Sequence, residues 1–205
     1  MNLAPNEPGE RILLHLCCGP CGEYPLLKLR EAGWQVTGYF HNPNIHPEAE
    51  HEKREAAARA FAQIHDLELV VESHPREELW RQFNSTSKLE HCRLCIFMRM
   101  NRVAAYASNN GFRFFTTSLL VSPWQEHQII LDAGQVTAER RQINFLAADF
   151  RPGYREGQEM AKRDGLYRQR YCGCIYSLKE TDEKFRTPYL EEFGLTLDDL
   201  PDRGA

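Results

Sequence analysis

The sequence predicts an α/β protein built on a doubly wound, mainly parallel five-stranded sheet with helices on both faces. Short apolar segments of strand length alternate with longer amphipathic segments, and Gly, Pro and Asn separate them. With 205 residues and an apolar share of 42%, the chain fits one domain with a sizeable core. We therefore expect residues 1–205 to form a single domain, with residues 1–10 flexible.

The first half of the chain is expected to hold three strands. Residues 11–16 (RILLHL) are short enough for a buried strand, and after the turn CCGPCG a helical pattern over residues 23–33 (EYPLLKLREAG) stops at Gly33. Residues 34–40 (WQVTGYF) form the second strand. Pro47 stands in the first turn of the next helix beside three acidic residues, where both are favoured. Residues 67–71 form the third strand.

The second half continues this alternation and ends in a helical tail. The expected elements are a short helix over residues 77–83, a longer helix over 92–108, the fourth strand over 112–117 (FRFFTT), a helix over 126–141, the fifth strand over 143–147, a helix over 154–164 and the tail over 178–205. The longer helix ends before Asn110 and Gly111, which are typical helix-terminating residues.

Composition narrows the functional classes. No apolar run approaches the roughly 20 residues that a membrane-spanning helix needs, and the acidic, proline-containing start does not resemble a signal peptide. We therefore expect no membrane partner and a cytoplasmic location. The seven cysteines then indicate metal binding or redox catalysis rather than a disulfide scaffold, because the cytosol keeps ordinary thiols reduced.

Polar and thiol groups follow the expected strands at their carboxyl ends, where ligands bind in such sheets. They are Cys17, Cys18 and Cys21 after the first strand, Asn42 and Asn44 after the second, Thr116, Thr117 and Ser118 after the fourth, and Asp149 after the fifth. The first loop, HLCCGPCG, lacks the Gly/Ser-rich phosphate cradle expected of a nucleotide pyrophosphatase, so ATP is not an expected cosubstrate.

Three groups of cysteines carry the candidate chemistry. Cys17, Cys18 and Cys21 lie where a strand turns into a helix, whose positive N-terminal end favours thiolates. Cys92 and Cys95 form a CxxC motif, and two sulfurs from each group would suit either tetrahedral zinc or an iron-sulfur cluster. Cys172 and Cys174 lie in a glycine-containing segment, where they could serve as a redox dithiol, as metal ligands or as structural residues.

Five ordered motifs resemble the iron-sulfur epoxyqueuosine reductases that need no cobalamin, over about residues 11–180. The motifs are residues 12–21, 42–47 (NPNIHP), 91–95 (HCRLC), 114–119 (FFTTSL) and 165–177, and together they include all seven cysteines. The resemblance implies an adenine-nucleotide-hydrolase-like sheet and a two-electron reduction of epoxyqueuosine to queuosine at the wobble position of tRNA. It also implies a 4Fe-4S cluster with one additional iron ion, and an electron donor that the sequence does not identify.

The resemblance assigns roles to individual residues. It implies that Cys17, Cys18, Cys92 and Cys95 bind the cluster, that Cys21 binds the additional iron, and that Cys172 and Cys174 form a redox pair. In this reading Asn42, Asn44, Thr116, Thr117 and Ser118 face the substrate. Residues 138–170 hold eight Lys/Arg against five Asp/Glu. From this band Arg140, Arg141, Lys162, Arg163, Arg168 and Arg170 would hold phosphates of the anticodon arm.

Two other classes of function remain open on the sequence alone. One is a structural zinc-thiolate module that binds RNA without catalysis. The other is a thiol-disulfide oxidoreductase that acts on a protein disulfide through Cys172 and Cys174. Both explain fewer of the motifs than the reductase does.

Overall fold

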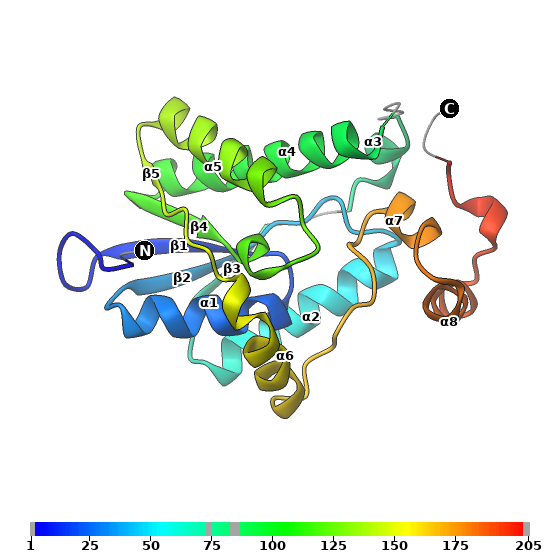
Figure 1. Ribbon diagram of the computed structural model, residues 1–205, viewed down its shortest axis with the longest axis horizontal. Coiled ribbons are helices and arrows are strands. Elements are labelled where there is room, and N and C mark those ends of the chain that lie inside the picture. The colour runs from blue at the N-terminus through cyan, green and yellow to red at the C-terminus, as the bar shows by residue number, and fades with distance from the viewer. Residues whose placement is uncertain (1–2, 73–74, 83–86, 203–205) are drawn as a thin grey trace.

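The computed structural model describes residues 3–72, 75–82 and 87–202, and its centre is a five-stranded sheet in the order β3-β2-β1-β4-β5 (Figure 1). The strands are β1 (Arg11–Leu16), β2 (Gln35–Phe40), β3 (Leu69–Val71), β4 (Phe114–Thr117) and β5 (Asn144–Phe145). Every strand pairing is parallel. The doubly wound α/β class predicted from the sequence is therefore confirmed.

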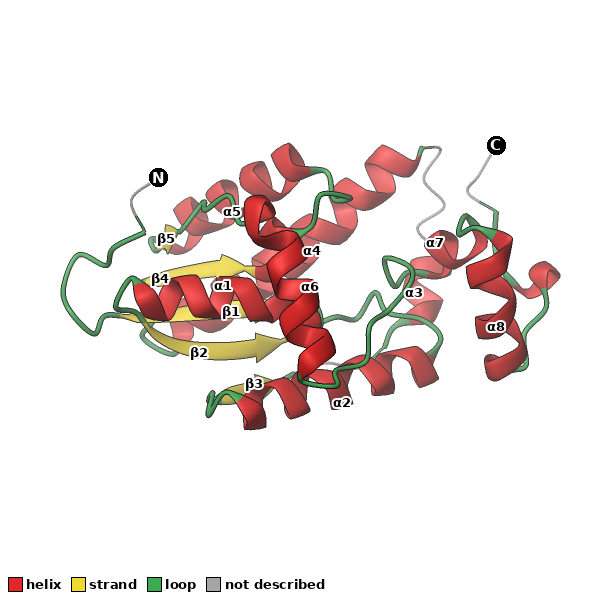
Figure 2. Cartoon of the chain, turned by 60° about the horizontal axis from the view of Figure 1, so that its bottom comes forward, coloured by secondary structure: helices red, strands yellow, loops and turns green. Residues whose placement is uncertain are grey.

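Helices cover both faces of the sheet. They are α1 (Gly19–Glu31), α2 (Glu48–Ile64), α3 (Glu77–Gln82), α4 (Lys88–Asn109), α5 (His127–Arg141), α6 (Tyr154–Arg163), α7 (Ile175–Lys179) and α8 (Glu183–Phe193). Helices α4 and α5 pack together on one side of the sheet, and α1, α2 and α6 lie on the other (Figures 1 and 2). Phe83, the last residue of the expected short helix, lies outside the described residues.

The main core is the sheet with its two helical layers. The inner strands carry fully buried residues such as Leu13 and Phe115, and α4 contributes Met100 and Val103 to the same apolar cluster. Parallel strands covered on both faces are expected to be buried on both sides and mainly apolar, and residues 12–16 of β1 are all buried. Among the described helices, none is long and apolar enough to cross a bilayer.

Two helices begin earlier than the sequence predicts. Helix α1 begins at Gly19, directly after the cysteine pair, with Pro20 in its first turn, where a proline costs no hydrogen bond. Helix α4 begins at Lys88, where the hydroxyl of Ser87 accepts a hydrogen bond from the backbone of Glu90. The CxxC motif therefore lies inside α4 rather than at its first turn.

A second apolar cluster lies beyond the carboxyl ends of the strands, where α7 and α8 are found (Figure 1). Its buried members include Trp80, Tyr176 and Leu178, together with two cysteines, Cys95 and Cys174. The hydroxyl of Tyr176 donates to the carbonyl of Trp80. This cluster holds the C-terminal cysteine segment against α3 and α4, above the edge of the sheet where ligands are expected.

Candidate metal centre

Three thiols meet where β1 passes into α1. The Sγ atoms of Cys17, Cys18 and Cys21 all lie within 4.8 Å of one another, and those of Cys17 and Cys18 are 3.8 Å apart. Cys18 is the N-cap residue of α1, and Cys21 lies in its first turn. A side chain at Gly19 would place its Cβ 2.5 Å from the carbonyl oxygen of Ala57, so glycine there allows α1 to begin against α2.

The three thiols differ in how readily they ionise. Hydrogen bonds from Cys18 and Cys21, helped by Ser118, hold the pKa of Cys17 well below its usual value. Burial raises the pKa of Cys18, and the hydrogen bonds with Cys17 and Cys18 raise that of Cys21. The protein alone therefore favours one thiolate, at Cys17. Because metals bind deprotonated sulfur, a bound cation would favour ionisation of the other two thiols.

The remaining cysteines gather around Cys95 rather than joining the first three. The groups whose charges act on Cys95 are Arg99, Cys172, Cys174 and Cys92, and burial raises its pKa to about 12. Arg99 is 3% exposed. Its pKa is raised by the charges of Cys95, Cys172 and Cys17, although burial opposes this. This buried guanidinium thus lies between the two thiol groups.

Cys172 and Cys174 have different surroundings. Cys172 is exposed, and Nε2 of Gln125 lies 3.5 Å from its sulfur. Cys174 is buried, and its sulfur accepts a hydrogen bond from the backbone of Ser177 at the start of α7. All seven cysteines lie among the described residues, and each is a free thiol. No disulfide joins Cys172 to Cys174 in this structure.

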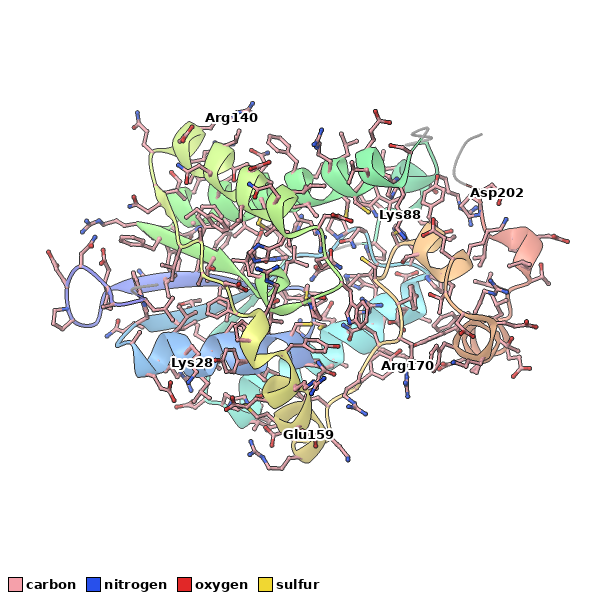
Figure 3. The ribbon with its side chains drawn as sticks, viewed as in Figure 1. Lys28, Lys88, Arg140, Glu159, Arg170 and Asp202 are labelled. Atoms are coloured by element: carbon pink, nitrogen blue, oxygen red, sulfur yellow. The ribbon has the colours of Figure 1, made fainter. Side chains whose placement is uncertain are left out.

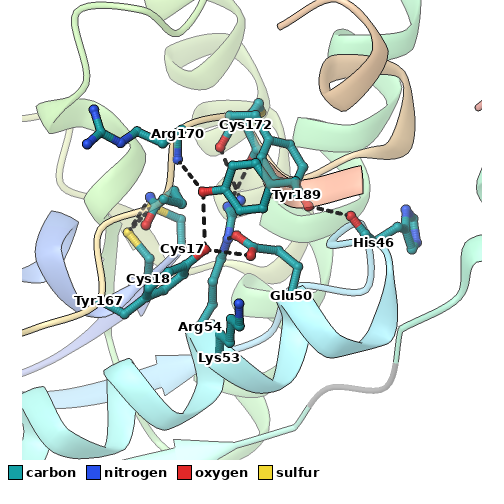
Figure 4. A network of polar contacts seen from close by, with 12 residues as sticks. Cys17, Cys18, His46, Glu50, Lys53, Arg54, Tyr167, Arg170, Cys172 and Tyr189 are labelled. Carbon is teal, nitrogen blue, oxygen red and sulfur yellow. Dashed lines mark hydrogen bonds and ion pairs between the residues drawn. The ribbon is translucent and has the colours of Figure 1, made fainter. Parts of the chain in front are cut away.

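Arg54 holds the segment that carries Cys172 (Figure 4). Its guanidinium donates to the carbonyl oxygens of Tyr171 and Cys172 at 3.1 and 2.9 Å, and to Glu50 at 2.6 Å. The hydroxyl of Tyr167 donates to the other oxygen of Glu50. Glu50 and Arg54 are both buried, so this ion pair fixes the backbone of the segment from inside the protein.

A cavity of 690 Å³ opens over these groups. Among the residues predicted from the sequence, its walls contain Cys17, Cys21, Asn42, Asn44, Arg168, Arg170 and Cys172. Ligand pockets commonly have about 300 to 1,000 Å³, so this cavity could take a modified nucleobase. The segments that follow β1 and β2 and the segment that carries Cys172 all contribute to the cavity, as expected for a site at the carboxyl edge of the sheet.

The Thr-Thr-Ser run at the carboxyl end of β4 is not among the residues that line the cavity. The hydroxyl of Thr116 donates to the carbonyl of Leu146, and Oγ1 of Thr117 lies 2.8 Å from Nδ1 of His15. Ser118 donates to the sulfur of Cys17 and accepts from its backbone N–H. All three side chains are buried, so their contacts position the first cysteine loop.

The basic band divides in space. Arg168 and Arg170 line the cavity, and the guanidinium of Arg170 lies over the ring of Phe185. Arg140 lies at the far end of α5, well separated from Arg170 in Figure 3. Asp149 is paired with Arg151, whose hydrogen bond lowers the pKa of this carboxyl to about 2. Asp149 therefore stays ionised and is not among the residues that line the cavity.

Three residues of the site were not singled out from the sequence. They are Arg54, Arg99 and Gln169, whose Nε2 donates to the sulfur of Cys18 at 2.9 Å. The sequence spacing could have identified two of them, because Arg54 follows Glu50 by four residues and Arg99 follows Cys95 by four. Residues four apart share a helix face. Gln169 lies in an irregular segment, where spacing gives no such signal.

Fold and site together define the class of protein: a doubly wound α/β protein with a thiol-rich cavity at the carboxyl ends of its strands. The family model described as "Epoxyqueuosine reductase QueH" matches residues 12–180. The chain belongs to this family and is an oxidoreductase, which confirms the resemblance seen in the five motifs.

Curated relatives over most of the chain carry the same description. A protein of Dehalococcoides mccartyi named epoxyqueuosine reductase QueH is 37% identical over 180 residues, covering 87% of this chain and 98% of its own. Proteins of the same name from Acinetobacter baylyi and Thermotoga maritima are each 32% identical. These alignments cover 86% and 84% of this chain, and 84% and 93% of the relatives.

Solved structures share the fold at low sequence identity. One is described as a predicted subunit of tRNA methyltransferase from Methanocaldococcus jannaschii, with a TM-score of 0.52, 12% identity and coverage of 95% of this chain and 93% of that one. Another is the U34-tRNA thiolase NcsA from Methanococcus maripaludis with its [4Fe-4S] cluster, with a TM-score of 0.57, 13% identity and coverage of 94% and 70%. They establish the fold alone.

Proposed function

We propose that this chain reduces the epoxide of epoxyqueuosine to the cyclopentene of queuosine at the wobble position of tRNA, in the cytoplasm. The observation that carries the proposal is the cavity, whose walls combine cysteine thiols with Arg168 and Arg170 in a member of the QueH family. The name of the relatives supports this reaction, and the cavity offers thiols and arginines that could serve as redox-active and phosphate-binding groups.

The thiols fit the metal groups that this function implies. Three sulfurs within 4.8 Å of one another, one of them readily ionised, form a soft donor set suited to iron-sulfur or zinc binding. In the proposal, Cys17, Cys18, Cys92 and Cys95 hold a 4Fe-4S cluster, and Cys21 holds the additional iron. When bound, these groups would supply electrons one at a time and a Lewis acid.

Oxidation of two cysteine thiols releases as many electrons and protons as the reduction of the epoxide consumes. Removal of an epoxide oxygen as water, with formation of the alkene, consumes two electrons and two protons. Oxidation of the Cys172 and Cys174 thiols to a disulfide would release two electrons and two protons. The exposed sulfur of Cys172 lies in the cavity wall, where an external reductant could restore the dithiol.

The cavity also offers groups that could orient the substrate. Asn42 and Asn44 are both buried and line the cavity, and Oδ1 of Asn44 has no hydrogen-bond partner within the described residues. A buried acceptor of this kind can take a hydrogen bond from a hydroxyl or amine of a ligand. Because the target base is part of a tRNA stem-loop, it would have to leave its stack to reach this depth.

Arg168 and Arg170, which line the cavity, give a prediction about tRNA binding. Arg168→Glu with Arg170→Glu should raise the dissociation constant for tRNA by about tenfold or more, since two lost phosphate contacts at about 1 kcal/mol each exceed one decade. The salt dependence of binding should become less steep, because fewer counterions are released. Filter binding at several salt concentrations measures both quantities. Arg59→Glu with Arg113→Glu, two exposed arginines that are not placed at the tRNA site, serves as the control. Equal affinity and an equal salt slope for wild type and the Arg168 and Arg170 variant would remove these arginines from the tRNA site.

The function itself is tested with anaerobically purified protein, a chemical reductant and tRNA that carries epoxyqueuosine. We expect queuosine in the nucleosides of the digested tRNA, together with iron and sulfide in the protein. Colourless protein that contains zinc and leaves the epoxide intact would instead favour the zinc module. Reduction of a protein disulfide without metal, and without tRNA turnover, would favour the thiol-disulfide oxidoreductase.

A further inference from the structure

A second group of potential ligands lies outside the cysteine site, where α1, α2 and α6 meet. Glu23 belongs to α1, His65 ends α2, and Asp164 ends α6. Their donor atoms all lie within 4.8 Å of one another. Glu23 is 1% exposed, and none of the three lines the 690 Å³ cavity. The reductase chemistry therefore makes no use of them.

The contacts inside this cluster have the length of hydrogen bonds but not their geometry. Nε2 of His65 lies 2.9 Å from Oε2 of Glu23 and 3.5 Å from Oδ2 of Asp164. All three atoms are buried, as is Oε1 of Glu23, and none has a hydrogen-bond partner within the described residues. Buried polar atoms without partners are rare in folded proteins. These atoms approach one another without pointing at one another, as ligands around a common centre do.

The spacing suits a metal ion. Ligands about 2.1 Å from a transition metal stand about 3.0 to 3.4 Å apart in octahedral or tetrahedral geometry. The distances from His65 Nε2 to the two carboxylates, 2.9 and 3.5 Å, are close to these values. One imidazole nitrogen with two carboxylate oxygens is a donor set that Mn²⁺, Fe²⁺ and Zn²⁺ accept.

The contacts around the cluster use only part of its carboxylate oxygens. Arg163 also pairs with Asp164, but it uses the other oxygen, Oδ1, from an exposed position. Oδ2 of Asp164 and both carboxylate oxygens of Glu23 therefore remain buried without a hydrogen bond within the described residues.

The surrounding fold holds the ligands in place. The ring of Phe61 packs against that of His65 with centroids 4.8 Å apart, and Arg30 donates to the carbonyl of His65. Gly153, directly before α6, allows this helix to approach α1 closely, because any other residue there would place its Cβ 2.1 Å from the ring of Tyr24. The His65 side chain is 20% exposed, which leaves an entry path for an ion.

We propose that Glu23, His65 and Asp164 bind one divalent first-row transition-metal ion through two carboxylates and one imidazole. The ion joins α1, α2 and α6 immediately before the segment that carries Gln169 and Cys172. Its role is structural, because it lies outside the cavity. It fixes the point from which the C-terminal cysteine segment leaves the helical layer.

The test uses Mn²⁺, because thiolates bind this hard cation poorly and the cysteine site will not compete for it. Anaerobically prepared, iron-loaded protein is titrated with Mn²⁺, and the electron paramagnetic resonance signal of free Mn²⁺ is measured. We expect wild-type protein to bind one equivalent of Mn²⁺ and to unfold at a higher temperature in its presence. Zn²⁺ should displace the bound Mn²⁺.

Glu23→Gln and His65→Gln should each weaken Mn²⁺ binding by more than about tenfold. Loss of a residue that only hydrogen-bonds to a metal ligand already lowers metal affinity by about 10- to 100-fold. Iron content should stay at the wild-type level. Glu159→Gln, on the exposed face of α6, is the matched control and should bind Mn²⁺ as wild type does. Asp164→Asn provides a third variant if burial of an amide at position 23 prevents folding.

Two results would overturn the proposal. Wild-type protein without a saturable Mn²⁺ site would do so whatever the variants show. Variants that lose stability but bind Mn²⁺ as wild type does would show that the cluster is a buried ion pair only. Because iron content and epoxide reduction are measured separately, failure of this site leaves the proposed function intact.

Discussion

Cys18→Ala is expected to leave anaerobically prepared protein without the brown colour, iron and sulfide of a 4Fe-4S cluster, and without detectable epoxyqueuosine reduction. The sulfur of Cys18 is fully buried, lies 3.8 Å from that of Cys17, and accepts a hydrogen bond from Gln169. Alanine at the N-cap position of α1 removes a donor that no neighbouring side chain can replace. Absorption spectra with iron and sulfide analysis measure the result.

Cys21→Ala is the matched control for this prediction. Cys21 lies one turn into the same helix and belongs to the same thiol group, but it is proposed to bind the additional iron. We expect this variant to keep the cluster spectrum while losing about one iron per chain and most of the activity. Wild-type iron and sulfide in Cys18→Ala would show that Cys18 is not a cluster ligand.

The order of the elements could be predicted because it follows from local patterns. Strand β1 was placed at its observed bounds, since RILLHL is a short, mainly apolar segment of the kind that forms a buried strand in a parallel sheet. Strands β3 and β5 were predicted longer than they are. Both are edge strands, and each pairs with only part of its neighbour, β3 with residues 38–40 of β2 and β5 with residues 114–115 of β4. The chain's own pattern does not encode how far this pairing extends.

The start of α1 was predicted four residues too late for a different reason. Residues 19–22 (GPCG) have low helix propensity, and a sequence pattern assigns them to a turn. The close packing of Gly19 and Gly22 against α2 overrides this preference, because only residues without a side chain fit beside Ala57 and Phe61. The consequence for the site is direct, since Cys18 and Cys21 become part of a helix terminus.

The site was predictable as a set of residues more than as an arrangement. The rule that ligands bind at the carboxyl edge of the sheet identified Cys17, Asn42 and Asn44, which do line one cavity. The rule could not show that Thr116 and Thr117 turn their hydroxyls into the core. It also gave no sign that Cys95 shares its surroundings with the C-terminal thiols, because that proximity depends on how α7 folds back.

The buried arginines explain how the C-terminal thiols reach the sheet edge. Arg54 reaches from α2 to the backbone of residues 171 and 172, and Arg99 reaches from α4 toward Cys172 and Cys17. Each guanidinium is buried, so water screens its charge only weakly, and that of Arg54 is paired with Glu50. A segment with no regular structure of its own is thereby fixed by two helices on opposite sides of the sheet.

Arg54→Met is expected to lower the free energy of unfolding by about 3 to 5 kcal/mol, because removing one partner of a buried ion pair leaves an uncompensated charge. The side chains of Arg54 and Glu50 are 2% and 0% exposed, and the guanidinium also donates to two backbone carbonyls. Urea denaturation under anaerobic conditions, followed by circular dichroism, measures the change.

Arg59→Met is the matched control, since Arg59 pairs with Glu55 at the same spacing on α2 but is 58% exposed, and such surface pairs contribute about 0.2 to 1 kcal/mol. Equal losses for the two variants would mean that burial of the Arg54 pair does not stabilise the cysteine segment. The double variant Arg54→Met with Glu50→Met should lose less than Arg54→Met alone, because no unpaired charge then remains in the core.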